Sequence, residues 1–378
     1  MLKTSSTIVL VLLFLGSTAF GLAREEIYLN LQGDLSGLSQ SHKKKFKFTG
    51  ASLIYKSQTV PISIKTRGQN CLAAYRKCFS ITLKEAIAGL DKKFILASLS
   101  QDHGYINYVL GLKFMEEAGV NFIQYKYVHI YINNKSYGLY LMLEKPEQVL
   151  VDRKGAVFVG RRSHWPKKDE IKFYDQSTAP LAKKEYQLFY EKMITTANKL
   201  KGPRKHEYLK NHMDIESYFN WLATNVLLKN GDYDDELFYY VANHPKGDIY
   251  FEFMGWDYED LFTKQHFVNK FLHPFSIRNT ILYSLVQKLD YYIYKDKYEY
   301  SLFLQHMRNL MASRFTNDKI KEIFHNVHKE IEPFLVQEVL LSSVKDDHVK
   351  VAYTKKYIED LLKLRLSEVL KRAKDLTT

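Results

Sequence analysis

The alternation of apolar and polar residues changes once along this chain, and that change limits the folds open to it. From Glu26 to Glu144 the pattern mostly has the period of two that is typical of β-strands, whereas from Ile215 onward it is mainly helical. A strand pair at 237–241 and 249–253 interrupts the helical part. This order predicts an α+β fold with a β-rich first part and a helical second part.

The β-rich part contains several local signals of strands, turns and one helix. Asn133-Asn134-Lys135-Ser136 separates two apolar runs and predicts a hairpin. A helix is expected from Gly104 to Ala118, ended by Gly119. The expected strands are 27–31, 60–66, 78–83, 128–132 and 137–143.

We expect two lobes joined at Lys145-Pro146-Glu147. The first would be a β-rich N-lobe with one helix, residues 24–145. The second would be a mainly helical C-lobe, residues 146–378. A small β-rich lobe followed by a larger helical lobe is the outline of a protein kinase, so we predict a two-lobed protein-kinase-like fold.

The N-terminal segment, residues 1–23, has the pattern of a secretory signal peptide. Lys3 precedes the apolar run 8–15, and small residues follow, with cleavage expected after Gly21 or Ala23. The alternative is a membrane anchor, but the run is well short of the ~20 residues that a span needs. We therefore expect a secreted or periplasmic protein with no stable membrane span after signal removal.

Two cysteines, Cys71 and Cys78, are the only ones in the chain. An oxidising compartment would let them pair, and the closed loop would stabilise the fold by about 2.5 kcal/mol. The alternative is a pair of reduced thiols beside a strand. We predict the disulfide, because export and the short separation both favour it.

The formal charge of +13 indicates acidic partners, which could be an acidic protein, an anionic surface polymer, a phosphorylated cofactor or nucleic acid. The lysines are spread along predicted helices and turns, and no nucleic-acid-binding motif is present. We expect no nucleic-acid partner.

Two acidic segments carry the chemistry that we predict. Asp232 follows an apolar helix in an Asn-Gly-Asp turn, and Asp257 follows an apolar strand and a Gly-Trp pair. Acids joined by a strand-turn-strand segment can converge on one site, where one accepts a proton from a hydroxyl and the other holds magnesium on a triphosphate. We predict Asp232 as the catalytic base or hydroxyl-orienting acid, against the alternative of a turn aspartate bonded to local amides. A helix N-cap is the alternative for Asp257.

Several motifs resemble the spore-coat CotH kinase family. The acidic block is similar over 218–232, the tyrosines at 239 and 240, and 255–259. In the N-lobe, 67–70 with 75–81 resembles the family's arginine-glycine-asparagine loop and lysine-bearing strand, and 128–144 resembles its hairpin. The resemblance implies an atypical protein kinase fold, ATP and a divalent metal as cofactors, and phosphorylation of proteins on serine or threonine.

Metal ligation is assigned from that resemblance. Asp257 is the expected magnesium ligand, and Glu236 stands where the family usually has an asparagine that acts as a second ligand. The departure leaves open the number of metals and the choice between magnesium and manganese. A calcium loop over Asp232, Asp234, Asp235 and Glu236 is an alternative, although it lacks the glycine and distal glutamate of an EF-hand.

Phosphate contacts are expected from the N-lobe. Lys77 and Arg67 are the predicted cations, with Arg76 as the competitor of Lys77, and Glu116 or Glu117 could pair with that lysine. The alternative is that basic residues at strand edges protect against aggregation and that the helical glutamates face solvent.

Glu144 ends the predicted hairpin where a kinase hinge would contact adenine, or else it caps or pairs locally. The sequence therefore predicts an exported atypical protein kinase that transfers the ATP γ-phosphate to serine or threonine of a protein. Adenylylation on the same fold is one alternative. The other is a non-catalytic protein that uses its basic surface for binding or assembly.

Overall fold

The protein is described by a computed structural model, which covers residues 25–33, 35, 38, 45–68, 70–74, 76–100, 102, 104–162, 170–171, 180–242, 249–263, 287–335 and 355–377. The predicted signal segment, 1–23, lies outside the described residues. Within the ranges above, no helix is long and apolar enough to cross a membrane.

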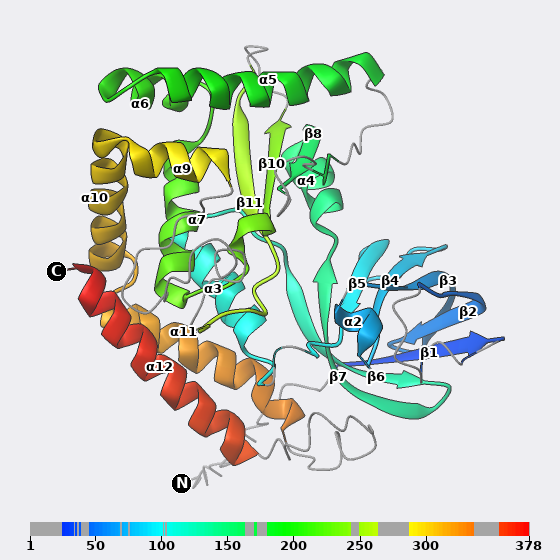
Figure 1. The fold of residues 1–378 in the computed structure, drawn as a ribbon. Helices are drawn as coiled ribbons and strands as arrows, with labels where there is room; N and C mark the ends of the chain where they lie inside the picture. The colour runs from blue at the N-terminus through cyan, green and yellow to red at the C-terminus, as the bar shows by residue number, and fades with distance from the viewer. Residues whose placement is uncertain are drawn as a thin grey trace, which may run out of the picture.

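Seven strands form a closed barrel in the order β1-β2-β3-β4-β5-β7-β6, on the right of Figure 1. The parallel pairing of β1 with β6 closes it. Each strand predicted in this part is present, whereas β2 and β5 were not predicted. The bounds are β1 Glu26–Gln32, β2 Lys47–Tyr55, β3 Gln58–Arg67, β4 Cys78–Leu83, β5 Lys93–Ala97, β6 Tyr125–Ile132 and β7 Lys135–Glu144.

The predicted hairpin is β6–β7, and its turn has the residues that its geometry requires. Ile132 pairs with Lys135, so Asn133 and Asn134 form a two-residue loop with φ of 48° and 63°. Asparagine tolerates this left-handed conformation, which matches the twist of the strands. The Asn133 side chain also bonds to the amide and carbonyl of Leu31, at 2.7 and 3.0 Å, and so ties the hairpin to β1.

The two faces of β7 belong to different cores. Tyr140 and Met142 point into the barrel core, whereas Leu139, Leu141 and Leu143 pack into a second and larger core. The predicted helix is α3, Asn107–Ala118, and Gly119 ends it at φ 76°. Its buried face lies in the larger core, so the one helix predicted for the N-lobe packs with the C-terminal helices.

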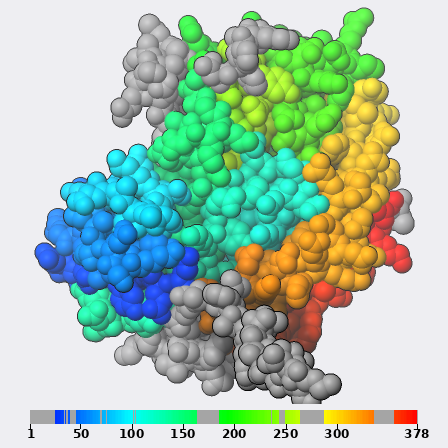
Figure 2. Space-filling model, turned by 180° about the vertical axis from the view of Figure 1, so that it is seen from behind, coloured from blue at the N-terminus to red at the C-terminus, as the bar shows by residue number. Residues whose placement is uncertain are grey.

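The larger core is built from a small sheet and helices. The sheet has the order β11-β10-β8-β9, with β10 and β11 at the predicted strand pair and β8 and β9 not predicted. Figure 2 shows from behind that the barrel, in blue, and helices α10 to α12, in yellow to red, lie on opposite sides of the molecule. The bounds are α2 Asn70–Ala73, α4 Pro146–Lys154, β8 Ala156–Arg161, β9 Glu170–Ile171, α5 Pro180–Lys199, α6 Pro203–Lys210, α7 Ile215–Leu228, η1 Tyr233–Asp235, β10 Leu237–Ala242, β11 Phe251–Gly255, α9 Lys288–Lys295, α10 Lys297–Ser313, α11 Asn317–Ile331, η2 Glu332–Phe334 and α12 Lys355–Thr377.

Helix α7 positions the acidic turn. The Asp214 carboxylate accepts a bond from the Ser217 amide at 3.0 Å and caps the first turn. Nearly all of the helix is buried, between α3, α10 and β11. Lys229 ends it in the left-handed conformation, at φ 51°, and the chain turns there into the Asn-Gly-Asp segment. The packing of this apolar helix thus fixes the position of the turn that carries Asp232.

Candidate active site

Three carboxylates converge at one place. One oxygen each of Asp232, Glu236 and Asp260 lies within 4.8 Å of the others. They come from three segments: the turn after α7, the residue before β10, and the loop after β11. Glu236 is buried and the other two are half-buried. Oxygen donors gathered in this way suit a hard divalent cation such as Mg²⁺ or Mn²⁺.

The turn that carries two of these acids is held by Asn230, whose side chain is fully buried. Its Nδ2 donates to Oε2 of Glu236 at 2.7 Å and to Oδ1 of Asn225 at 3.0 Å. Its Oδ1 accepts a bond from the Asp232 amide at 3.1 Å. A single amide side chain therefore links the end of α7 to both acids.

The loop after β11 is bonded to the same turn through its backbone. The Gly231 amide donates to the Asp260 carbonyl at 3.0 Å, and the Trp256 amide donates to the Glu236 carbonyl at 3.1 Å. Gly255 leaves no room for a side chain, because an added Cβ would lie 1.7 Å from the Tyr258 hydroxyl oxygen. These contacts place Asp260 beside Asp232 and Glu236.

Asp257, the predicted metal ligand, is not one of the three converging acids. Its backbone is left-handed, at φ 59°, and its carboxylate interacts with Arg67 and Glu259. The Arg67 guanidinium lies over the Trp256 ring, 5.7 Å from its centroid. Burial lowers the pKa of Arg67, while Asp257 opposes that shift. The structure therefore brings together two predicted residues, Asp257 and Arg67, next to the three converging carboxylates.

Negative charge accumulates around the three converging carboxylates. Burial raises the pKa of Glu259 well above its usual range, and Asp257, Asp260, Asp102 and Asp232 raise it further. Burial also raises the pKa of Asp102 to about 7. Like charges at this density repel each other unless a proton or a cation offsets them. The donor set therefore fits a divalent metal ion.

Lys77, the predicted phosphate contact, bonds within its own loop. Its side chain is buried, and its Nζ donates to the carbonyls of Leu72 and Ala74, at 2.8 and 2.5 Å. Burial lowers its pKa. Arg76 is also buried and donates to the Tyr105 hydroxyl. These bonds tie the Lys77 side chain to the segment that contains α2. The structure does not bring it to the three converging carboxylates.

Cys71 and Cys78 form the predicted disulfide, with their Cα atoms 5.5 Å apart. Cys78 is the partner of Arg67 in the register of β3 and β4. The bridge therefore closes the loop directly beside the residue that reaches Trp256.

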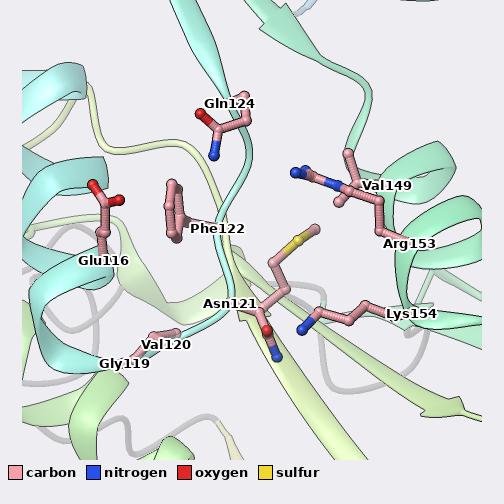
Figure 3. Close-up of a pocket in the computed structure, with 10 residues that line it drawn as sticks. Glu116, Gly119, Val120, Asn121, Phe122, Gln124, Val149, Arg153 and Lys154 are labelled. Atoms are coloured by element: carbon pink, nitrogen blue, oxygen red, sulfur yellow. The ribbon is translucent and has the colours of Figure 1, made fainter.

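Glu144 lies beside a separate pocket of about 390 Å³, shown in Figure 3. Its Oε2 accepts bonds from the Gln124 amide, at 2.5 Å, and from the Arg153 guanidinium. The pocket is lined by the end of α3, the 119–124 segment, α4 and Met254 of β11. None of the three converging acids lines it. A nucleotide contact for Glu144 stays a prediction.

The two glutamates at the end of α3 pair with other lysines. Oε2 of Glu116 lies 3.8 Å from Nζ of Lys113, and Oε2 of Glu117 lies 3.8 Å from Nζ of Lys319. Both pairs are partly exposed, so they add little to stability.

The sequence matches the family described as CotH kinase protein over residues 64–366. The chain belongs to this family. The match begins in β3 and ends in α12, so it spans Arg67, the acidic turn and the loop after β11. The CotH family assignment confirms the predicted resemblance and a kinase-type protein. No curated protein matches the sequence.

Two solved structures are similar at low scores. The proinflammatory kinase CtkA of Helicobacter pylori is 10% identical over 80% of this chain and 95% of that chain, with a TM-score of 0.35. The HipA, HipB and operator DNA complex of Shewanella oneidensis MR-1 is 12% identical over 75% of this chain and 57% of that chain, with a TM-score of 0.31. Scores this low carry no weight for fold or function.

Sequence reasoning missed Asp260 and Asn230. Asp260 belongs to the acidic run 257–260, in which three of four residues are acidic, so the run itself was a signal that more than one acid faces the site. Asn230 precedes the predicted base by two positions, but nothing in its neighbours indicated that it bonds to Glu236.

Proposed function

We propose that this CotH-family chain is an exported atypical protein kinase with a two-lobed kinase-like fold. It would transfer the γ-phosphate of ATP to serine or threonine of a protein. The observation that carries the proposal is the convergence of Asp232, Glu236 and Asp260 next to Arg67 and Asp257. Phosphoryl transfer needs little more than such a metal site, a positioned base and a cation for phosphate.

Each residue has a proposed role. Glu236 and Asp260 would hold the divalent ion, and Asp257, in the same loop as Asp260, remains a proposed ligand. A bound ion would neutralise charge on the triphosphate. Asp232 would accept the proton of the attacking hydroxyl, since its turn is anchored by Asn230 and its side chain is partly exposed. Arg67 would bind phosphate oxygens.

Export and an acidic protein substrate are further parts of the proposal. The Cys71–Cys78 disulfide supports an oxidising compartment, together with the predicted signal segment. The net charge of +13 supports an acidic partner.

The test is incubation with a protein acceptor and ATP labelled separately at the α and γ phosphates, in the presence of Mg²⁺ or Mn²⁺. Transfer of γ label to serine or threonine is expected. Transfer of the α label would instead establish adenylylation. The carboxylate of Glu236, which stands where the family usually has an asparagine, would then belong to that different chemistry. Absence of both transfers and of ATP binding would leave a non-catalytic binding protein.

A further inference from the structure

Two cations of β3 lie on one outer face of the barrel. Ile64 and Thr66 are buried, so Lys65 and Arg67, which alternate with them, point away from the barrel core. Arg67 reaches the Trp256 ring. Lys65 is therefore on the face of the strand that meets the loop after β11.

Strand pairing adds a third cation to this face. Lys65 pairs with Ser80 of β4, and Thr82, two residues further on the same face, pairs with Lys93 of β5. The Lys93 Nζ donates to Oε1 of Gln148 at 3.2 Å. Gln148 belongs to the first turn of α4, so Lys93 reaches from the barrel to the start of that helix.

Lys145 stands immediately before α4 and is half-buried. Burial lowers its pKa, and Lys65, Arg67 and Lys93 lower it further, while Glu147 opposes them. Lys65 and Arg67 of β3 and Lys93 of β5 thus all act on Lys145, in the linker before α4. An anion placed among them would relieve that repulsion.

We propose that Lys65, Lys93 and Lys145 join Arg67 in a binding site for the polyphosphate chain of the nucleotide, the role that the sequence assigned to Lys77. This inference rests on the proposed kinase function. A lysine acts as a point charge toward phosphate oxygens and needs no fixed hydrogen-bond geometry. The Lys77 Nζ already donates to two carbonyls of its own loop, so fewer of its donors remain for a phosphate.

The position of the cluster favours a nucleotide over an acidic protein segment. Arg67 interacts with Asp257, in the loop that also supplies Asp260 to the proposed metal site. Arg67 therefore links the cations of the barrel to the segment that would help to hold the metal. Lys145 is half-buried, so a small anion can contact it more readily than a broad protein surface can.

The experiment is calorimetric titration of the exported protein with Mg-ATP and, separately, with inorganic tripolyphosphate. Lys65→Ala and Lys145→Ala should each weaken binding of both ligands about tenfold, the effect expected for one charged contact. Lys56→Ala is the matched control, because Lys56 lies in the turn at the opposite end of β3 and the charge change is the same. Its affinities should equal those of the wild type, and thermal melting would show that all three variants fold.

The outcomes separate the two proposals. A wild type that binds neither ligand would overturn the kinase function and the phosphate site together. If the wild type binds but Lys65→Ala and Lys145→Ala behave like the Lys56 control, only the phosphate site is wrong. Retained tripolyphosphate affinity with a raised KM for an acidic protein acceptor would likewise overturn the site and assign these cations to the substrate.

Discussion

Asn230 donates a hydrogen bond from Nδ2 to Oε2 of Glu236 at 2.7 Å, and both side chains are buried. The same amide group bonds to Asn225 and accepts a bond from the Asp232 amide. The geometry of two proposed site acids therefore depends on one neutral side chain. Loss of a group that orients metal ligands in this way typically lowers metal affinity by about 10- to 100-fold.

Asn230→Ala should weaken Mn²⁺ binding by about 10- to 100-fold, because Glu236 loses the bond that orients it. The variant should also lose ~1–3 kcal/mol of stability, since buried partners are left unsatisfied. Calorimetric titration with Mn²⁺ and a thermal melt measure the two effects.

Asn225→Ala is the control for Asn230. It removes the Asn225–Asn230 bond but leaves the contact with Glu236 in place. It should lower the melting temperature with a much smaller loss of Mn²⁺ affinity. Equal losses in the two variants would mean that Asn230 acts only through stability.

Asp260→Asn should reduce Mn²⁺ affinity at least tenfold, because it replaces a charged oxygen in the group of three by an amide. Asp257→Ala should abolish metal-dependent ATP binding while the fold stays intact. Titration with Mn²⁺ alone detects the loss of a metal ligand. A variant that loses only Mg-ATP affinity would instead identify a residue that acts through Arg67. Asp318→Asn, at a 96% exposed side chain, is the matched control. Unchanged Mn²⁺ affinity in Asp260→Asn would remove it from the site.

Asp232→Asn should keep the affinity for ATP and Mg²⁺ within a few fold, while phosphoryl transfer falls by ~10² or more, the scale for loss of a positioned base. Single-turnover transfer and nucleotide affinity are measured on the same preparation. Because Asp232 lies close to Glu236 and Asp260, a parallel loss of metal binding would identify it as a ligand. Full transfer activity would show that another group takes the proton.

Reduction of the Cys71–Cys78 bridge should lower stability by about 2.5 kcal/mol, because the unfolded chain regains the entropy of the closed loop. Both cysteines are buried, so a Cys71→Ser, Cys78→Ser variant is compared with protein treated with a small reductant. Thermal melting with and without reductant gives the shift, and the double variant should show no response to reductant. Two free thiols counted in the untreated, denatured protein would rule out the bridge.

Local pattern was sufficient to predict much of the fold. The period-two runs predicted five of the seven barrel strands, Gly119 predicted the end of α3, and the Asn-Asn turn predicted the β6–β7 hairpin. These features depend on neighbours in sequence, and so they can be inferred without the rest of the chain. The division into lobes at 145 and 146 stays a prediction.

The sequence by itself placed Asp232 and Glu236 in one turn and paired the two cysteines, because those residues are few positions apart. Only the tertiary structure decided which acid of the 257–260 run joins them. That choice depends on the left-handed backbone of Asp257 and on bonds between the loop and the end of α7. The barrel likewise decided which lysines share a face: its strand register puts Lys65 and Lys93 on one outer face, whereas the Lys77 Nζ bonds to the Leu72 carbonyl in α2. Contacts between distant segments arise from packing and strand register, which no local pattern encodes.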